Sequence, residues 1–146
     1  RPVLADAGGD YSYWDTGRRA SLRELLVNEG LAVHVSQQMS PGHAAWEYFG
    51  YQRRLFARIR ELESTMRRVM EPDLHSAGLG LRLKYLSGGM SDEARTVDRV
   101  VLPERAGYYL GTRMVEPAVT ARGLPWAVRA SADELALVAG SLAATA

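Results

Sequence analysis

The sequence predicts a mainly α-helical domain of four or five helices, with at most one short strand near residues 79–86. Two observations favour this class: apolar residues recur at helical spacing over long stretches, and two serine–glutamate pairs stand where helices should begin. The chain has 146 residues, of which 47% are hydrophobic, enough for one domain with its own core. We therefore expect residues 1–146 to form a single domain.

The charge balance and the absence of cysteine exclude several kinds of function. The chain carries 18 basic and 17 acidic residues, so its formal net charge is only +1. This balance favours neither nucleic acid nor an anionic membrane surface as a partner. Without cysteine there is no disulfide and no thiolate metal site. No apolar run approaches the roughly 20 residues that span a bilayer, and nothing indicates a compartment.

The first helix is expected over residues 21–39, after a glycine-rich and aromatic loop at residues 1–20. Ser21 and Glu24 are three residues apart and fit a capping box, in which each side chain accepts a hydrogen bond from a backbone N–H at the helix start. The helix should end before Pro41. Its apolar stripe consists of Leu22, Leu25, Leu26, Leu31 and Val35.

A second helical region is expected over residues 43–70, ending before Pro72. Gly50 should bend this region or divide it in two. Most of its arginines and glutamates fall outside the apolar face, so we expect them in solvent. The apolar face consists of Trp46, Phe49, Leu55, Ile59, Leu62, Met66 and Val69.

Residues 79–86 alternate between apolar and other side chains, which is the period of a strand. A single strand cannot satisfy its own backbone groups, so this one needs a partner, which a segment preceding Arg1 would supply.

Two more helices are expected towards the carboxyl end. One runs from Pro103 to Arg122, with the proline in its first turn, Gly123 beyond its end and a kink at Pro117. The last runs from Ser131 to Ala144 and again opens with a capping pair, Ser131 and Glu134.

The run Val27-Asn28-Glu29-Gly30-Leu31-Ala32 lies inside the first expected helix. An Asn-Glu-Gly-x-Ala run on a helix resembles the third-ligand segment of gluzincin metallopeptidases. In that group two histidines of a His-Glu-x-x-His helix bind zinc, and a glutamate from a second helix is the third protein ligand. The resemblance implies that Glu29 binds zinc, that Asn28 supports it, and that Gly30 lets two helices approach closely.

The later segment Arg105-Ala106-Gly107-Tyr108-Tyr109-Leu110-Gly111 extends this likeness. The order of a glutamate helix, a helix bearing Trp46 and a late Gly-Tyr helix resembles a family of predicted zinc-dependent proteases, known mainly as a domain of unknown function. The likeness covers most of residues 20–140.

This resemblance also implies roles for residues of the late helix. Tyr108 or Tyr109 would donate a hydrogen bond to the oxyanion of the transition state, with Gly107 and Gly111 leaving room around the ring. Arg113 would hold a substrate carboxylate or pair with Glu116. Core packing is the alternative for each tyrosine, a structural role for Arg113 and a solvated charge for Glu29.

The sequence contains no His-Glu-x-x-His, and no histidine precedes Glu29. We therefore expect the chain to be a fragment of a zinc peptidase that hydrolyses peptide bonds, with the zinc helix in a missing amino-terminal segment. Alone it should be inactive and should not bind zinc tightly, because one carboxylate is not a multi-ligand site. The alternatives are a non-catalytic helical domain that binds a protein partner and a degenerate peptidase. The other histidines, His34, His43 and His75, share no ligand spacing.

Overall fold

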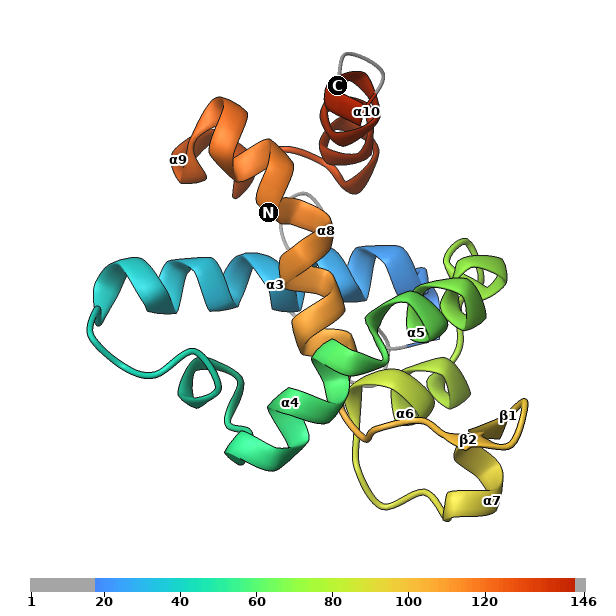
Figure 1. Cartoon of the computed structure of the whole chain (residues 1–146). Coiled ribbons are helices and arrows are strands. Elements are labelled where there is room, and N and C mark those ends of the chain that lie inside the picture. The colour runs from blue at the N-terminus through green and yellow to red at the C-terminus, as the bar shows by residue number, and fades with distance from the viewer. Residues whose placement is uncertain (1–17, 144–146) are drawn as a thin grey trace.

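A computed structural model describes residues 18–143 and shows a mainly helical fold (Figure 1). The mainly helical class is confirmed, but eight α-helices lie within the described residues, more than the four or five expected. The additional ones are short or arise where an expected helix divides. The elements in order are α3 (Leu22–Met39), the 3-10 turn η1 (Glu47–Phe49), α4 (Arg53–Glu61), α5 (Glu63–Met70), the 3-10 turn η2 (Glu71–Asp73), α6 (Leu79–Leu86), α7 (Asp92–Arg95), β1 (Thr96–Val97), β2 (Val100–Val101), α8 (Gly107–Arg122), α9 (Leu124–Ala127) and α10 (Ala132–Ala143).

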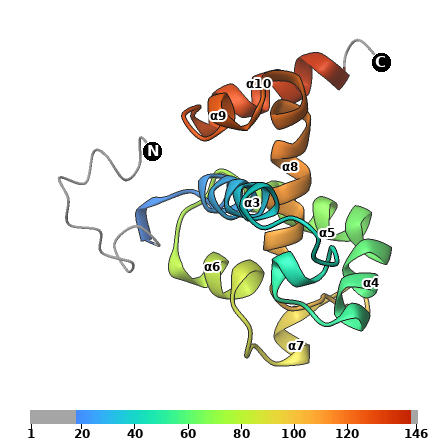
Figure 2. The same cartoon turned by 90° about the vertical axis from the view of Figure 1, so that its left-hand side faces the viewer.

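The crossing of α3 and α8 forms the centre of the fold (Figures 1 and 2). A Cβ atom added to Gly111 would lie 2.1 Å from the carbonyl oxygen of Leu26, and one added to Gly30 would lie 2.3 Å from the carbonyl carbon of Gly111. Only glycine lets two helix backbones approach this closely. The two glycines therefore fix where the helices cross.

Helix α3 begins and ends where the sequence predicts. The Ser21–Glu24 capping box is present, with the serine N–H donating to the glutamate over 2.7 Å. The N–H groups of Leu22 and Arg23 donate to backbone carbonyls of residues 76 and 74, each over 2.9 Å. Contacts with the segment after η2 therefore hold the first turn, while the aromatic-rich stretch at residues 1–17 lies outside the described residues.

The region 43–70 divides at two places. Gly50 adopts a left-handed conformation, with φ at 62°, and closes η1 before α4 begins. This confirms the expected division at Gly50. A second break lies at Leu62, whose ψ of 8° is outside the helical range and separates α4 from α5.

The expected strand at residues 79–86 is wrong, because this segment forms α6. Tyr85 and Leu86 are both buried, whereas neighbours in a strand point to opposite faces. The strands lie elsewhere, as the antiparallel pair β1 and β2, in which Val97 pairs with Val100. Asp98 and Arg99, both with positive φ, form the turn between them.

Helix α8 begins at Gly107, four residues later than expected. Pro103 is buried in the preceding segment, and Arg105 has a φ of 56°, which interrupts any helix before residue 107. The helix contains Pro117, and Gly123 follows its last residue as predicted. At α10 the N–H of Ser131 donates to Glu134 over 2.7 Å, which confirms the second capping pair.

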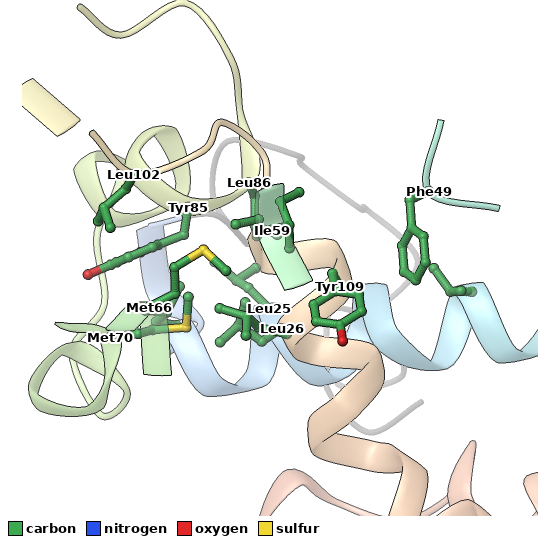
Figure 3. Packing of buried hydrophobic residues seen from close by; sticks show 14 of the residues in the cluster. Leu25, Leu26, Phe49, Ile59, Met66, Met70, Tyr85, Leu86, Leu102 and Tyr109 are labelled. Atoms are coloured by element: carbon green, nitrogen blue, oxygen red, sulfur yellow. The ribbon is translucent and has the colours of Figure 1, made fainter. Parts of the chain in front are cut away.

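Two groups of buried side chains stabilise the fold. The larger lies between α3, α8 and the elements from η1 to α6, and includes Leu26, Ile59 and Tyr109 (Figure 3). The smaller joins α3 and α8 to α9 and α10 through Leu31, Val115 and Leu135. Among residues 18–143, no helix is both long and apolar enough to cross a membrane.

Candidate functional site

Glu29 lies on α3 directly before Gly30, so its half-buried side chain is beside the crossing with α8. Tyr108, in the first turn of α8, is also half-buried. Burial raises the pKa of Tyr108, and the negative charge of Glu29 raises it further. Glu29 and Tyr108, which the sequence predicts for one site, are therefore near enough for the Glu29 charge to act on the phenol.

Arg105 also contacts Tyr108. Its guanidinium lies 5.1 Å from the centre of the Tyr108 ring and 5.7 Å from that of Tyr51. It donates hydrogen bonds to the backbone carbonyls of Phe49 and Gly50, over 3.3 and 3.4 Å. The Tyr51 hydroxyl donates to the carbonyl of Arg105 over 2.5 Å. These contacts join η1 to the start of α8 and fix a positive charge against the Tyr108 ring.

Tyr109 lies on a different side of α8. Successive helical residues are about 100° apart, so Tyr109 projects about 160° from Gly111, whereas Tyr108 projects only about 60° from it. Because Gly111 contacts α3, Tyr109 points away from the helix that carries Glu29. Its ring packs edge-on against Phe49 (Figure 3) and against Phe56, each with centroids 5.8 Å away.

The Tyr109 hydroxyl donates to Glu63 Oε2 over 2.8 Å. Arg67 binds the other oxygen of the same carboxylate through Nε and Nη2, at 2.9 and 2.7 Å. Partial burial alone would raise the pKa of Glu63, but these hydrogen bonds outweigh burial and lower it. Burial and the Glu63 charge together raise the pKa of Tyr109. Glu63 therefore stays ionised, and the Tyr109 proton is held in a bond to it.

Arg113 belongs to the Tyr109 side. It pairs with Glu116, one of the two roles that the sequence allowed, and its Nε lies 3.6 Å from Glu63 Oε1. The sequence offered a signal for the Glu63–Arg67 pair, since the two are four residues apart on a helix.

Residues 11–136 match the family described as "Predicted Zn-dependent protease (DUF2268)". The chain belongs to this family. No curated protein and no solved structure matches it. The match covers Glu29 and both tyrosines, so both sides of α8 are part of the predicted zinc-dependent protease domain.

Within residues 18–143 no three histidine, cysteine, aspartate or glutamate residues lie close enough to hold one ion. His34 Nε2 lies 3.4 Å from the carbonyl oxygen of Thr112, and His43 is near Ser40 and Glu47. Glu29 and Asn28 are thus the only residues here to which the family resemblance gives a place at the metal.

The glycines of α8 have a different role from the one expected. A Cβ on Gly107 would lie 2.7 Å from Leu86 Cδ2 and 2.8 Å from the Tyr85 carbonyl oxygen, and Gly111 meets Leu26. They therefore provide space for α6 and α3, and not for a tyrosine ring. Sequence reasoning also missed Arg105, because nothing in its neighbours predicts a left-handed arginine.

Proposed function

We propose that the chain is part of a zinc-dependent metallopeptidase in which Glu29 is the carboxylate ligand to the metal. The supporting observation is the position of Glu29 beside the α3–α8 crossing, where its charge acts on Tyr108. A His-Glu-x-x-His helix outside residues 1–146 would supply two imidazoles and a general base. Bound zinc would activate a water molecule and polarise the scissile peptide carbonyl.

Tyr108 is the residue that we propose as the hydrogen-bond donor to the developing oxyanion. Its raised pKa keeps the phenol protonated at neutral pH, so the O–H remains available to donate. The Arg105 guanidinium packs against the ring. Tyr109 is less suited, because its hydroxyl already donates to Glu63 on the side of α8 away from Glu29.

Asn28 and Arg113 have supporting roles in this proposal. Asn28 precedes Glu29 on α3 and would orient the ligand carboxylate. Arg113 is engaged by Glu116 and Glu63, so we assign it to the structure of the Tyr109 side and not to the substrate of the zinc centre.

The test is to read the coding sequence that precedes Arg1 in frame, express the longer polypeptide, and measure cleavage of an internally quenched peptide mixture. The proposal predicts an upstream His-Glu-x-x-His, cleavage that a chelator abolishes, and no cleavage by residues 1–146 alone. A start codon immediately before Arg1, with no such motif, would contradict it. The chain would then be a helical domain that binds a protein partner without catalysis, or a degenerate peptidase.

A further inference from the structure

Helix α4 presents a basic surface to solvent. Of its nine residues, four are arginine and one is acidic, Glu61. All five charged side chains are exposed, and α4 lies at the edge of the molecule (Figure 2). The apolar side chains turn inward, with Ile59 fully buried and Phe56 packed against the larger core. The outward face of α4 is therefore more basic than the chain as a whole, whose formal net charge is +1. The four arginines are Arg53, Arg54, Arg58 and Arg60.

One of these arginines is already neutralised. Arg58 binds Glu61 over 2.9 Å, and the next acidic residue along the chain, Glu63, is bound by Arg67 over 2.7 Å. Among residues 18–143, no carboxylate forms an ion pair with the other three arginines of α4. We call these three residues the arginine face: Arg53, Arg54 and Arg60.

Aromatic rings lie under two of the three cations. The Arg53 guanidinium lies 5.8 Å from the centre of the Trp46 ring, and that of Arg60 lies 5.8 Å from the centre of the Phe56 ring. Both rings are half-buried and pack against the larger core. A guanidinium that stacks on a ring keeps its N–H groups, which lie in its own plane, available to a carboxylate.

Arg53 and Arg60 lie along one line of the helix. They are seven residues apart in sequence, which is about 10 Å along the helix axis and about 20° around it. Ala57 lies between them and is exposed, so no large side chain separates the two cations. In an extended polyproline II chain, every third side chain points the same way at intervals of about 9 Å. Two carboxylates three residues apart, as in Glu-x-x-Glu, would therefore meet both arginines.

The charge and packing of the chain favour a short partner over an extended polyanion. A nucleic acid or an anionic membrane would also meet the acidic side chains that balance the charge elsewhere on the chain. A membrane also requires apolar side chains that point outward, and those of α4 face the core. The Trp46 and Phe56 rings have guanidinium groups over them, so they offer less surface for a base to stack on. A short acidic protein segment would contact the arginine face alone.

We propose that the arginine face of α4 is a docking site for an acidic segment of another protein. Carboxylates of the segment bind Arg53 and Arg60, and Arg54 adds a third positive charge beside them. The Phe56 ring under Arg60 packs against Tyr109, so the face is on the Tyr109 side of α8. Docking there does not require zinc or the proposed peptidase activity.

The test uses a peptide of three Glu-Pro-Ala repeats as the probe, because proline favours the extended chain and the glutamates recur at every third residue. The same peptide with glutamine in place of glutamate is the uncharged counterpart. Binding to residues 1–146 is measured by NMR titration, following backbone signals and the side-chain Nε–H signals of the arginines. We expect the glutamate peptide to shift signals of α4, and the glutamine peptide to leave them unchanged. Equal binding of the two peptides, or no shift at millimolar concentrations, would overturn the proposal.

Exposed arginines on two helices provide matched variants. Arg53→Gln and Arg60→Gln should each weaken binding of the glutamate peptide about threefold, and the double variant about tenfold, since each loses one exposed ion pair to the ligand. Arg122→Gln is the control, because Arg122 is an exposed arginine of α8 that lies 5.5 Å from the centre of the Trp126 ring. It should leave the affinity unchanged. Equal weakening by Arg122→Gln would show a general charge effect and would contradict the site.

The class of partner is tested with a thymidine oligonucleotide and with vesicles that contain phosphatidylserine. We expect both to bind residues 1–146 more weakly than the glutamate peptide does at the same concentration of negative charge. Tighter binding of either one, weakened by Arg53→Gln, would overturn the assignment of an acidic protein segment to this face.

Discussion

Tyr108 and Tyr109 are neighbours in the sequence but belong to different regions of the molecule. Tyr108 lies beside Glu29, with Arg105 against its ring. Tyr109 lies across α8, where its hydroxyl donates to Glu63. The first side holds a phenol near a carboxylate that the family likeness implies to be a zinc ligand. The second holds a phenol within a network of ion pairs.

The helix crossing is what separates the two sides. Gly30 and Gly111 bring the backbones of α3 and α8 into contact. The angle around α8 between a residue and Gly111 therefore determines which side of the helix its side chain occupies. A step of one residue turns the side chain by about 100° and moves it from one environment to another. Tyr108 and Tyr109 should therefore be tested separately.

The largest expected effect comes from the crossing itself. Gly111→Ala places a Cβ 2.1 Å from a backbone oxygen that cannot move without shifting α3. We expect it to lower the free energy of unfolding by about 3 kcal/mol or more, measured by urea denaturation. Gly140→Ala is the control, because nothing lies within 4 Å of its added Cβ, and it should stabilise the chain by about 0.5 kcal/mol. Similar losses in both variants would contradict the close crossing.

The next effect concerns the ion pairs on the Tyr109 side. Glu63→Gln removes the charge that Arg67 and Arg113 share, and should cost about 1–2 kcal/mol at neutral pH. Glu61→Gln, at an exposed position, should cost less than about 0.5 kcal/mol. Thermal unfolding of the two variants measures the difference.

The cost of Glu63→Gln should also depend on pH. The pKa of Glu63 is lower in the folded chain than its ordinary value of 4.5, so its stabilisation is present above that value. It is lost as the pH falls through the folded pKa, where the wild-type carboxyl takes up its proton. The gap between wild type and variant should therefore narrow below about pH 4.5. A gap that stays constant down to pH 2 would show that the charge does not stabilise the fold.

The smallest stability effects separate the two tyrosines. Tyr109→Phe removes the donor to Glu63 and should cost about 1 kcal/mol, whereas Tyr108→Phe should cost about half as much. In an active longer protein the order should reverse. There Tyr108→Phe should lower kcat at least about a hundredfold, and Tyr109→Phe should change it much less. A larger loss of kcat in Tyr109→Phe would assign the oxyanion to the other side of α8.

Local signals in the sequence predict the starts of two helices, α3 and α10. The pairs Ser21–Glu24 and Ser131–Glu134 are each confined to one turn, so spacing alone identifies both helix starts. The alternation at residues 79–86 misled because the same residues also place Leu81 and Tyr85 four apart on one helical face. Packing against the core decides whether such a segment becomes a strand or a helix. The sequence of a short segment does not reveal that packing.

The candidate site was predictable only in part. The run around Glu29 and the two tyrosines were found from the sequence and a family likeness, but their division between two sides was not. The Tyr109–Glu63 bond joins residues 46 positions apart, and the left-handed Arg105 has no sequence signal. The Tyr109–Glu63 bond depends on how α8 is turned relative to α3, which no local pattern reveals.

The most direct test of the account is the zinc affinity of the longer polypeptide, measured by competition with a chromophoric chelator for wild type, Glu29→Gln and Glu47→Gln. Glu47 is an exposed glutamate and serves as the control. We predict that Glu29→Gln weakens zinc binding by a factor of about ten or more, while Glu47→Gln leaves it unchanged. Equal zinc affinity in wild type and Glu29→Gln would contradict the assignment of Glu29 as the ligand.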